Sequence, residues 1–208
     1  RSRMRLRGRR FDPTRTRALV LKRDPRILVA RERQIRTDLF IGIVIDCSGS
    51  MSSKDHMERA RLFGTLLAEA GKGFPGVDVR VFGFTDQVIY DAGDGTRCAA
   101  HALNAGGGNN DAGALWHAAQ AAHQSRRRAK LLVMISDGLP TECTVSALRG
   151  LVRNLRRRWN VCCAQVAVQP LAEVCFPHYV VLEGLEVEAA VRRFGMIVAG
   201  LVRTTLRE

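Results

Sequence analysis

The stretch LFIGIVIDCSGSM, residues 39–51, joins an apolar run to a polar turn and decides how the chain folds. Its first seven residues are apolar without alternation, which predicts a strand buried on both faces, as in a parallel sheet. Asp46, Ser48 and Ser50 follow at once, so oxygen-bearing side chains stand where the strand ends. In open α/β sheets ligands bind outside the carboxyl ends of the strands, so this stretch predicts a site there.

The rest of the chain repeats this alternation of apolar runs with segments that carry apolar residues every three or four positions. Strands that alternate with such helices predict an α/β fold with a doubly wound, mostly parallel central sheet flanked by helices, in one domain. Arg80 in VRVFGF fits an edge strand better than a central one. We expect Gly71 to end the first helix as its C-cap. The expected strands are 39–45, 79–84, 131–135, 161–168 and 179–182, with a short edge strand near 88–90, and the expected helices are 56–71, 111–128, 144–159 and 186–206.

Charge is distributed unevenly along the 208 residues, which have a net charge of +13. Residues 1–37 hold 14 Lys and Arg against three acidic residues. We therefore expect residues 1–37 to be a basic arm or extension that packs on the core, and residues 38–208 to be the α/β domain. Because the chain begins at Arg1 without an apolar leader, it is expected to be a fragment of a larger or processed protein.

Hydrophobicity and cysteine usage predict a cytoplasmic protein. The longest apolar runs fall far short of the roughly 20 residues that a membrane-spanning helix needs, so no membrane contact is expected. The six cysteines form no CxxC pair, and several lie in apolar strands. We interpret them as reduced, mostly buried thiols.

Three polar segments are expected to meet at the carboxyl edge of the sheet. Besides Asp46, Ser48 and Ser50, Asp137 in LLVMISDG follows another central strand, and GGGNND at 106–111 opens a helix. Two carboxylates with two or three neutral oxygens suit Mg²⁺, which prefers oxygen ligands and keeps some waters. Asp46 and Asp137 would bind the ion directly or through waters, leaving a position that an incoming carboxylate can fill. A turn that only caps the first helix, with a degenerate metal site, is the structural alternative.

These motifs resemble the von Willebrand factor A (vWA) domain and its metal-ion-dependent adhesion site, MIDAS, whose pattern is D-x-S-x-S, then a Thr, then an Asp after a later strand. The resemblance covers roughly residues 38–205. NNDAGALWHAA and VMISDGLPTE further resemble the C-terminal vWA domains of cobaltochelatase T-type and magnesium chelatase D-type subunits of bacteria. That likeness implies a metal-bearing domain that works with an AAA+ ATPase of the MoxR or chelatase kind.

One position departs from the family pattern. Asn109 stands where the Thr is common, and Asp111 follows two residues later. Asn109 is our preferred ligand because Asp111 is well placed as the N-cap of the following helix; Asp111 is the alternative. The metal ligands are therefore predicted to be Asp46, Ser48, Ser50, Asn109 or Asp111, and Asp137, and the ion Mg²⁺, with Mn²⁺ or Ca²⁺ as substitutes.

The leading functional hypothesis is a non-catalytic protein-interaction module that binds an Asp or Glu of a partner through the metal, the partner being an AAA+ ATPase. No G-x-x-x-x-G-K-[ST] loop is present, so ATP hydrolysis by this chain is not expected. The alternative is a nucleic-acid-binding protein that uses the arm RSRMRLRGRR, aided by SRRRAK and RNLRRRW, with the metal site degenerate. Phe11 is the one aromatic residue of the arm. Trp116 and Trp159 are expected in the core or in helix packing. Surface or packing roles are expected for His56, His101, His117 and His123.

Overall fold

The computed structural model describes residues 2–5, 10–11, 28–31, 38–53 and 55–205, and the chain divides into two compact units, 1–36 and 37–208. The first unit contains a three-stranded antiparallel sheet in the order β1-β3-β2, which was not predicted for the basic arm. The prediction that this arm packs on the core concerns mostly residues outside the described ranges, and it stays a prediction. The strands of this unit are β1 (Ser2–Arg5), β2 (Arg10–Phe11) and β3 (Leu28–Arg31).

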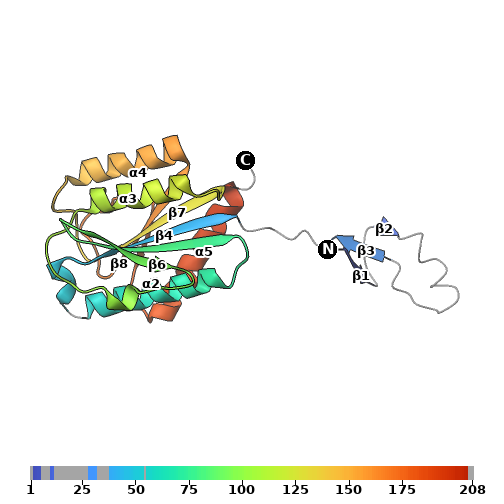
Figure 1. The fold of residues 1–208 in the computed structure, drawn as a ribbon, viewed down its shortest axis with the longest axis horizontal. Helices are drawn as coiled ribbons and strands as arrows, with labels where there is room; N and C mark the ends of the chain where they lie inside the picture. Colours follow the sequence, from blue (N-terminus) through green and yellow to red (C-terminus); the bar gives the residue numbers. More distant parts are fainter. Residues whose placement is uncertain (1, 6–9, 12–27, 32–37, 54, 206–208) are drawn as a thin grey trace. The chain divides into compact units, whose positions relative to one another are not determined.

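The second unit confirms the predicted fold class, a central, mostly parallel sheet with helices on both faces (Figure 1). The sheet has six strands in the order β6-β5-β4-β7-β8-β9, and only β6 runs antiparallel to its neighbour. The strands are β4 (Leu39–Asp46), β5 (Val77–Phe84), β6 (Ile89–Asp94), β7 (Ala129–Ser136), β8 (Val161–Ala167) and β9 (His178–Val181). The α-helices are α2 (His56–Lys72), α3 (Asp111–Gln124), α4 (Val145–Trp159) and α5 (Val187–Thr205), and the short 3₁₀ helices are η2 (Gly49–Ser52) and η3 (Ala100–Ala102).

The order of the strands makes β4 the place where the chain changes direction across the sheet. From β4 the chain runs through α2 to β5 and β6 on one side, then returns through α3 to β7 on the other side. Ligand sites of open α/β sheets lie at such a switch point, outside the carboxyl ends of the strands. The topology therefore places the expected ligand site where β4 and β7 end.

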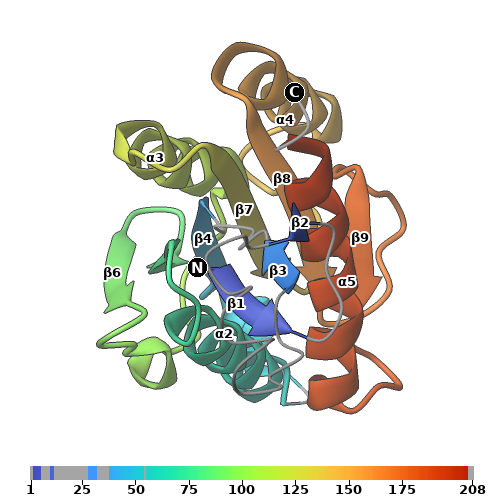
Figure 2. The ribbon, with the colours of Figure 1, turned by 90° about the vertical axis from the view of Figure 1, so that its right-hand side faces the viewer.

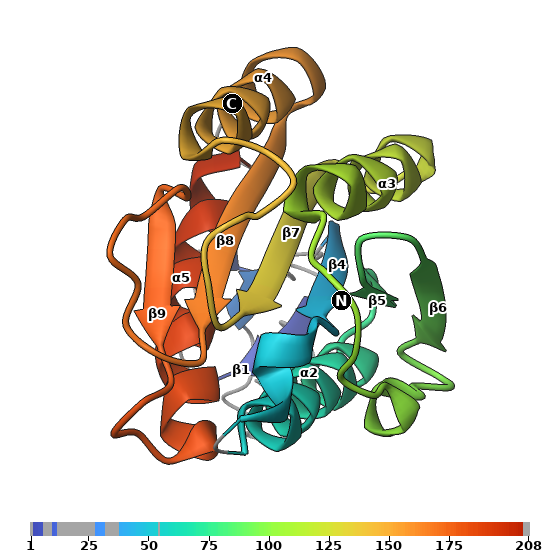
Figure 3. The same cartoon turned by 90° about the vertical axis from the view of Figure 1, so that its left-hand side faces the viewer.

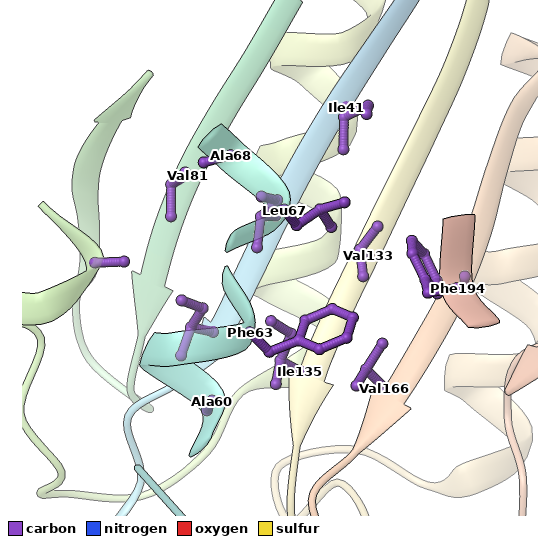
Figure 4. Packing of buried hydrophobic residues seen from close by; sticks show 14 of the residues in the cluster. Ile41, Ala60, Phe63, Leu67, Ala68, Val81, Val133, Ile135, Val166 and Phe194 are labelled. Atoms are coloured by element: carbon purple, nitrogen blue, oxygen red, sulfur yellow. The ribbon is translucent and has the colours of Figure 1, made fainter. Parts of the chain in front are cut away.

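All eight residues of β4 are buried, and its hydrophobic side chains are divided between two hydrophobic clusters on opposite faces. Ile43 and Ile45 belong to the cluster beneath α2 and α5, where Phe63 and Phe194 meet edge to face with ring centroids 5.9 Å apart (Figure 4). Phe40 belongs to the cluster beneath α3 and α4. Figure 2 looks along the strands and shows α3 and α4 on one face of the sheet and α2 and α5 on the other. A strand with apolar residues on both faces is therefore explained by helices on both faces.

Two glycines let α2 lie close to the sheet. A Cβ on Gly64 would lie 2.8 Å from the Ile45 side chain, and one on Gly71 would lie 2.5 Å from that of Val79. The prediction that Gly71 is the C-cap is wrong, because the helix continues to Lys72 and its C-cap is Gly73. Gly71 serves helix–sheet packing instead.

The edge assignment drawn from Arg80 is also wrong. β5 lies second from the edge, and the antiparallel strand β6 covers it. Arg80 is accommodated there because its guanidinium donates to Asp91 of β6 at 2.6 Å and lies 5.7 Å from the centre of the Phe82 ring. The charge is thus neutralised across the strand pair.

The six cysteines are free thiols in the structure. Within the described ranges, no helix combines the length and the apolar character needed to cross a membrane.

Candidate metal centre

The three polar segments singled out in the sequence lie together at the carboxyl edge of the sheet, the end that faces the viewer in Figure 3. Asp46 is the last residue of β4, Asp137 directly follows β7, and the loop that ends in α3 runs beside the turn after β4. We name this group of side chains the carboxylate centre. It consists of Asp46, Ser48, Ser50, Asn109, Asp111 and Asp137.

The turn after β4 directs both serine hydroxyls into the centre. The Ser48 amide donates to Oδ1 of Asp46 at 2.7 Å, which folds the chain back on the strand end. The Ser48 and Ser50 hydroxyls lie 3.0 Å apart, and the Ser50 hydroxyl donates to Oδ1 of Asp137 at 2.9 Å. The N-cap of α2 is Asp55. The turn therefore does not cap α2, and the Ser50 hydroxyl contacts the second carboxylate, Asp137.

The loop at 106–111 is fastened to this turn through its backbone. The Gly106 amide donates to the Cys47 carbonyl at 2.7 Å, and the Gly49 amide donates to the Gly107 carbonyl at 2.9 Å. These bonds bring Asn109, which is 5% exposed, next to Asp46. Two segments more than 50 residues apart in sequence are thereby held in one rigid arrangement.

Asn109 presents its amide nitrogen, not its oxygen, to the nearest carboxylate. Its Nδ2 donates to Oδ2 of Asp46 at 3.3 Å, while its Oδ1 accepts from the Thr141 amide at 3.3 Å. The Thr141 hydroxyl also donates to the Asn109 carbonyl at 3.0 Å. In this orientation the amide oxygen is engaged away from Asp46, so direct ligation by Asn109 requires the amide to turn over.

The reason given for preferring Asn109 over Asp111 does not hold. The N-cap of α3 is Asn110, whose Oδ1 accepts from the Gly113 amide at 2.9 Å, and Asp111 is the first helical residue. Asp111 is 2% exposed, and its buried Oδ2 has no hydrogen-bond partner among the described residues. Asp111 is thus free of the capping role and carries an oxygen without a partner.

His56 is a member of this neighbourhood that the sequence did not reveal. It begins α2, is 7% exposed, and its Nδ1 lies 3.1 Å from Oδ2 of Asp137. The expectation of a packing or surface role is corrected by this contact. No spacing pattern links the two residues, because the contact depends on how η2 returns the chain to the strand ends.

Burial makes negative charge unfavourable in the centre. It raises the pKa of Asp46 to about 6, although hydrogen bonds from Ser48 oppose the effect. Burial also raises the pKa of Asp111 to about 7, with the nearby Asp46 carboxylate adding to it. Taking carboxylates out of water costs free energy unless a cation or hydrogen bonds compensate them. The centre therefore favours binding of a positive charge.

The donor set fits a hard divalent cation. It offers carboxylate and hydroxyl oxygens together with the unpartnered Oδ2 of Asp111, and Mg²⁺, Mn²⁺ and Ca²⁺ prefer such oxygens. Over the described ranges, no group of three or more His, Cys, Asp or Glu side chains forms a metal site by itself. A site here therefore depends on the serine hydroxyls as well as the carboxylates. Which of the predicted residues bind a metal stays a prediction.

A pocket of about 770 Å³ lies at the opposite, amino edge of the sheet. Its lining includes Asp38, Asp78 and Arg127, and none of the carboxylate centre. Asp78 there is paired with Arg127, whose Nε donates to it at 2.8 Å. Asp38 and Asp78 in this pocket thus have an arginine partner, whereas the aspartates of the carboxylate centre have none among the described residues.

Comparison with known families gives a match over most of the chain. The model of the family described as "VWA domain containing CoxE-like protein" matches residues 1–196. Among curated proteins, none matches the chain.

Solved structures with the same fold come from several kinds of protein. The SpRpn10 VWA domain has a TM-score of 0.61 and 15% identity, covering 74% of this chain and 94% of that chain. BatB from Bacteroides thetaiotaomicron has a TM-score of 0.61 and 12% identity, covering 79% and 99%. The PilB minor pilin from Streptococcus sanguinis has a TM-score of 0.62 and 11% identity, covering 85% of this chain but only 64% of the pilin chain. At these identities the likeness shows the fold alone.

Proposed function

The chain belongs to the family of VWA domain containing CoxE-like proteins, and on that premise we propose that it is a metal-dependent protein-interaction module. In this proposal the carboxylate centre holds a divalent cation, through which the domain binds an Asp or Glu side chain of a partner protein. The bound cation supplies an open coordination position that attracts a carboxylate.

One observation carries this proposal: buried carboxylates converge without a matching cation. Asp46, Asp111 and Asp137 are each at most 2% exposed. Among the described side chains, no Lys or Arg forms an ion pair with them, and His56 is the one group in ion-pair contact that can carry positive charge. Ion pairs within the chain thus do not balance the centre, and a divalent ion would.

We assign the ligands as follows. Asp46 and Asp137 supply charge directly or through waters, and Ser48 and Ser50 supply hydroxyl oxygens. The unpartnered Oδ2 of Asp111 supports Asp111 as the additional ligand, with Asn109 holding Asp46 in place by its amide nitrogen. Mg²⁺ is the proposed ion, and Mn²⁺ and Ca²⁺ are the proposed substitutes.

The proposed partner is an AAA+ ATPase of the MoxR or chelatase kind. The support is the likeness of NNDAGALWHAA and VMISDGLPTE to the vWA domains of cobaltochelatase and magnesium chelatase subunits. We propose that the chain itself is non-catalytic and that ATP hydrolysis belongs to the partner, since the sequence of this chain contains no Walker A loop. We also propose that it acts in the cytoplasm, which agrees with its six free thiols.

Calorimetric titration with Mg²⁺ and Mn²⁺ tests the metal site. The full chain is expected to bind one ion, and Asp46→Asn is expected to abolish binding because it removes a charge at the centre without changing the shape of the side chain. Asp78→Asn is the matched control, since Asp78 lies at the other end of the sheet beside Arg127. Absence of binding by the unmodified chain, or equal loss in both variants, would contradict the metal site.

Capture of a MoxR-type ATPase from the same organism tests the partner. The unmodified chain is expected to retain the ATPase in Mg²⁺ and to release it in a chelator, whereas Asp46→Asn retains none. Retention that survives the chelator would show that the two proteins meet through another surface. Failure to bind the ATPase with normal metal binding would overturn the partner and leave the site intact.

A further inference from the structure

Three aromatic rings form a stack on the outer side of the helix pair α3 and α4, two helices that contact each other. The Trp159 ring stacks on that of His123 at a centroid distance of 4.7 Å, and it contacts the ring of Trp116 at 4.8 Å with the two planes tilted by 36°. Trp116 is 43% exposed and His123 is exposed. The two tryptophans thus pack between the helices as expected, and Trp116 also keeps surface in contact with solvent.

The segment that carries this stack is strongly basic. Residues 112–160 hold nine Lys and Arg and two acidic residues, Asp137 and Glu142, of which Asp137 is buried in the carboxylate centre. Residues 38–208 as a whole are close to neutral, with 19 Lys and Arg against 17 Asp and Glu. The basic α3–α4 segment is therefore balanced by an excess of acidic residues in the rest of this domain. Along α4 itself there are five arginines and no acid.

Several of these arginines have no countercharge within the molecule. Arg126, Arg153, Arg157 and Arg158 are exposed and form no ion pair with any residue that the structure describes. Arg157 and Arg158 directly precede Trp159, and Arg126 lies three residues after His123. Unpaired guanidinium groups thus lie next to the stacked rings along the chain.

The composition of this face favours a nucleic acid over a protein as its occupant. Protein interfaces bury contiguous apolar surface at their centre. Of the large hydrophobic side chains that are exposed in the described ranges, only Trp116 lies on α3 or α4. The others, Leu62, Phe74, Val88, Tyr90, Val174 and Met196, lie on other elements. A surface of flat rings and arginines without aliphatic side chains is typical of single-strand binding.

We propose that the α3–α4 face, with the stack of Trp116, Trp159 and His123 and the arginines beside it, binds single-stranded nucleic acid. Nucleobases continue the ring stack on the exposed faces of Trp116 and His123. The exposed guanidinium groups pair with phosphates along the strand. Stacking of this kind accepts any base, so the surface is sequence-tolerant. This face is distinct from the carboxylate centre, and its activity does not require a metal.

The two tryptophans of the stack are the only two in the sequence, so tryptophan fluorescence reports on this face alone. A single-stranded oligothymidylate added to the full chain is expected to quench this fluorescence to saturation, and anisotropy of the labelled oligonucleotide gives the affinity. A matched duplex, whose bases are already stacked on each other, is expected to quench it less. Saturable binding without quenching would overturn the proposal, because the basic arm would then account for the binding.

Substitutions separate the contribution of the ring stack to binding from the contribution of positive charge. Trp116→Ala is expected to weaken oligothymidylate binding by roughly fivefold or more, the value of one stacked base. Arg157→Gln with Arg158→Gln is expected to reduce the slope of log affinity against log salt by up to about 1.4, since each phosphate contact contributes about 0.7. Arg192→Gln with Arg193→Gln is the matched control, because it removes an adjacent, exposed arginine pair from α5.

Polyglutamate supplies the comparison with an acidic protein chain. The proposal requires that polyglutamate quench the tryptophans less than oligothymidylate and that Trp116→Ala leave polyglutamate binding unchanged. Equal quenching by both polyanions would overturn the proposal in favour of an acidic protein partner. Equal effects of the α4 and α5 arginine pairs would also overturn it, because charge anywhere on the surface would then suffice. Thermal melting of each variant confirms that the fold is retained.

Discussion

The two ends of the parallel strands place the same residue type in opposite environments. At the amino edge, the Arg127 guanidinium donates two hydrogen bonds of 2.8 Å to Asp78, and these bonds lower the pKa of Asp78. Asp38 lies 3.7 Å from the same guanidinium. At the carboxyl edge, burial raises the pKa of Asp46 to about 6 and that of Asp111 to about 7.

The two edges differ in whether their aspartates are compatible with stable folding. Aspartates with a cationic partner can remain ionised at little cost, whereas buried carboxylates without one oppose folding when they are ionised. The sheet would be more stable with neutral residues at its carboxyl edge. Buried carboxylates without a cationic partner at this one place lower the stability of the fold, and such a local cost is expected of a binding site.

The largest predicted effect is on the pH dependence of stability at the carboxyl edge. In a chelator, the free energy of unfolding is expected to fall as the pH rises from about 4 to about 7. Burial raises the pKa of Asp46 in the folded chain to about 6, from an ordinary value of 3.8, so the folded chain holds more protons than the unfolded chain in this window. At about 1.36 kcal/mol per pKa unit, the loss is about 3 kcal/mol from Asp46. Urea unfolding at a series of pH values measures it.

Asp46→Asn is the variant that isolates this effect. It removes the ionising group and also the Asp46 charge that raises the pKa of Asp111, so its stability curve should be flatter over the same window. At the amino edge the sign is reversed, because the lowered pKa of Asp78 costs stability only as the pH falls. If the stability curves of the unmodified protein and of Asp46→Asn ran parallel, ionisation of Asp46 would not destabilise the fold, and the contrast between the two edges would fail.

The next effect concerns which side chain completes the carboxylate centre. Asp111→Asn is expected to lower the Mn²⁺ affinity by roughly tenfold or more, because affinity in such sites follows the number of charged ligands. Asn109→Ala is expected to have a smaller effect, since Asn109 donates to Asp46 without offering its oxygen. Calorimetric titration of both variants ranks them. The reverse order would restore Asn109 as the ligand.

Much of the fold and the placement of the main side chains could be predicted from the sequence, because both follow from short-range patterns. The apolar run 39–45 predicts a strand covered on both faces, and all eight residues of β4 are buried. Parallel strands end at one edge, so Asp46 and Asp137 were expected near each other. The two serines indeed link them: the Ser48 amide donates to Asp46 at 2.7 Å, and the Ser50 hydroxyl, 3.0 Å from that of Ser48, donates to Asp137 at 2.9 Å.

The features that could not be predicted depend on tertiary contacts, or on a choice between adjacent residues that suit the same role equally well. Asn110 and Asp111 are both good N-caps, and the sequence gives no reason why Asn110 takes the role. The His56–Asp137 contact spans 81 positions. Trp116 and Trp159 meet because α3 and α4 lie side by side, so a sequence search for regularly spaced aromatic residues misses their stack.

His56 sharpens the comparison further, because it is the nearest counterpart at the carboxyl edge to Arg127 at the amino edge. Its Nδ1 lies 3.1 Å from Oδ2 of Asp137, which fixes the carboxylate while Oδ1 faces Ser50. His56→Phe is expected to lower Mn²⁺ affinity by about tenfold, the usual cost of losing a group that orients a ligand. His56→Asn, which can place an amide donor near the Nδ1 position, should restore part of it. Equal loss in both variants would indicate that the imidazole has another role.

The smallest effect is expected at the amino edge, where Asp38 and Asp78 already have an arginine partner. Arg127→Gln removes two hydrogen bonds to Asp78, yet both side chains are partly exposed, so the cost in stability is expected to be about 1 kcal/mol or less and to shrink in high salt. Mn²⁺ affinity should not change, because the substitution lies at the far end of the strands. If Arg127→Gln weakened metal binding as strongly as His56→Phe, the two edges would be coupled through the sheet, and the division between a folding edge and a binding edge would not hold.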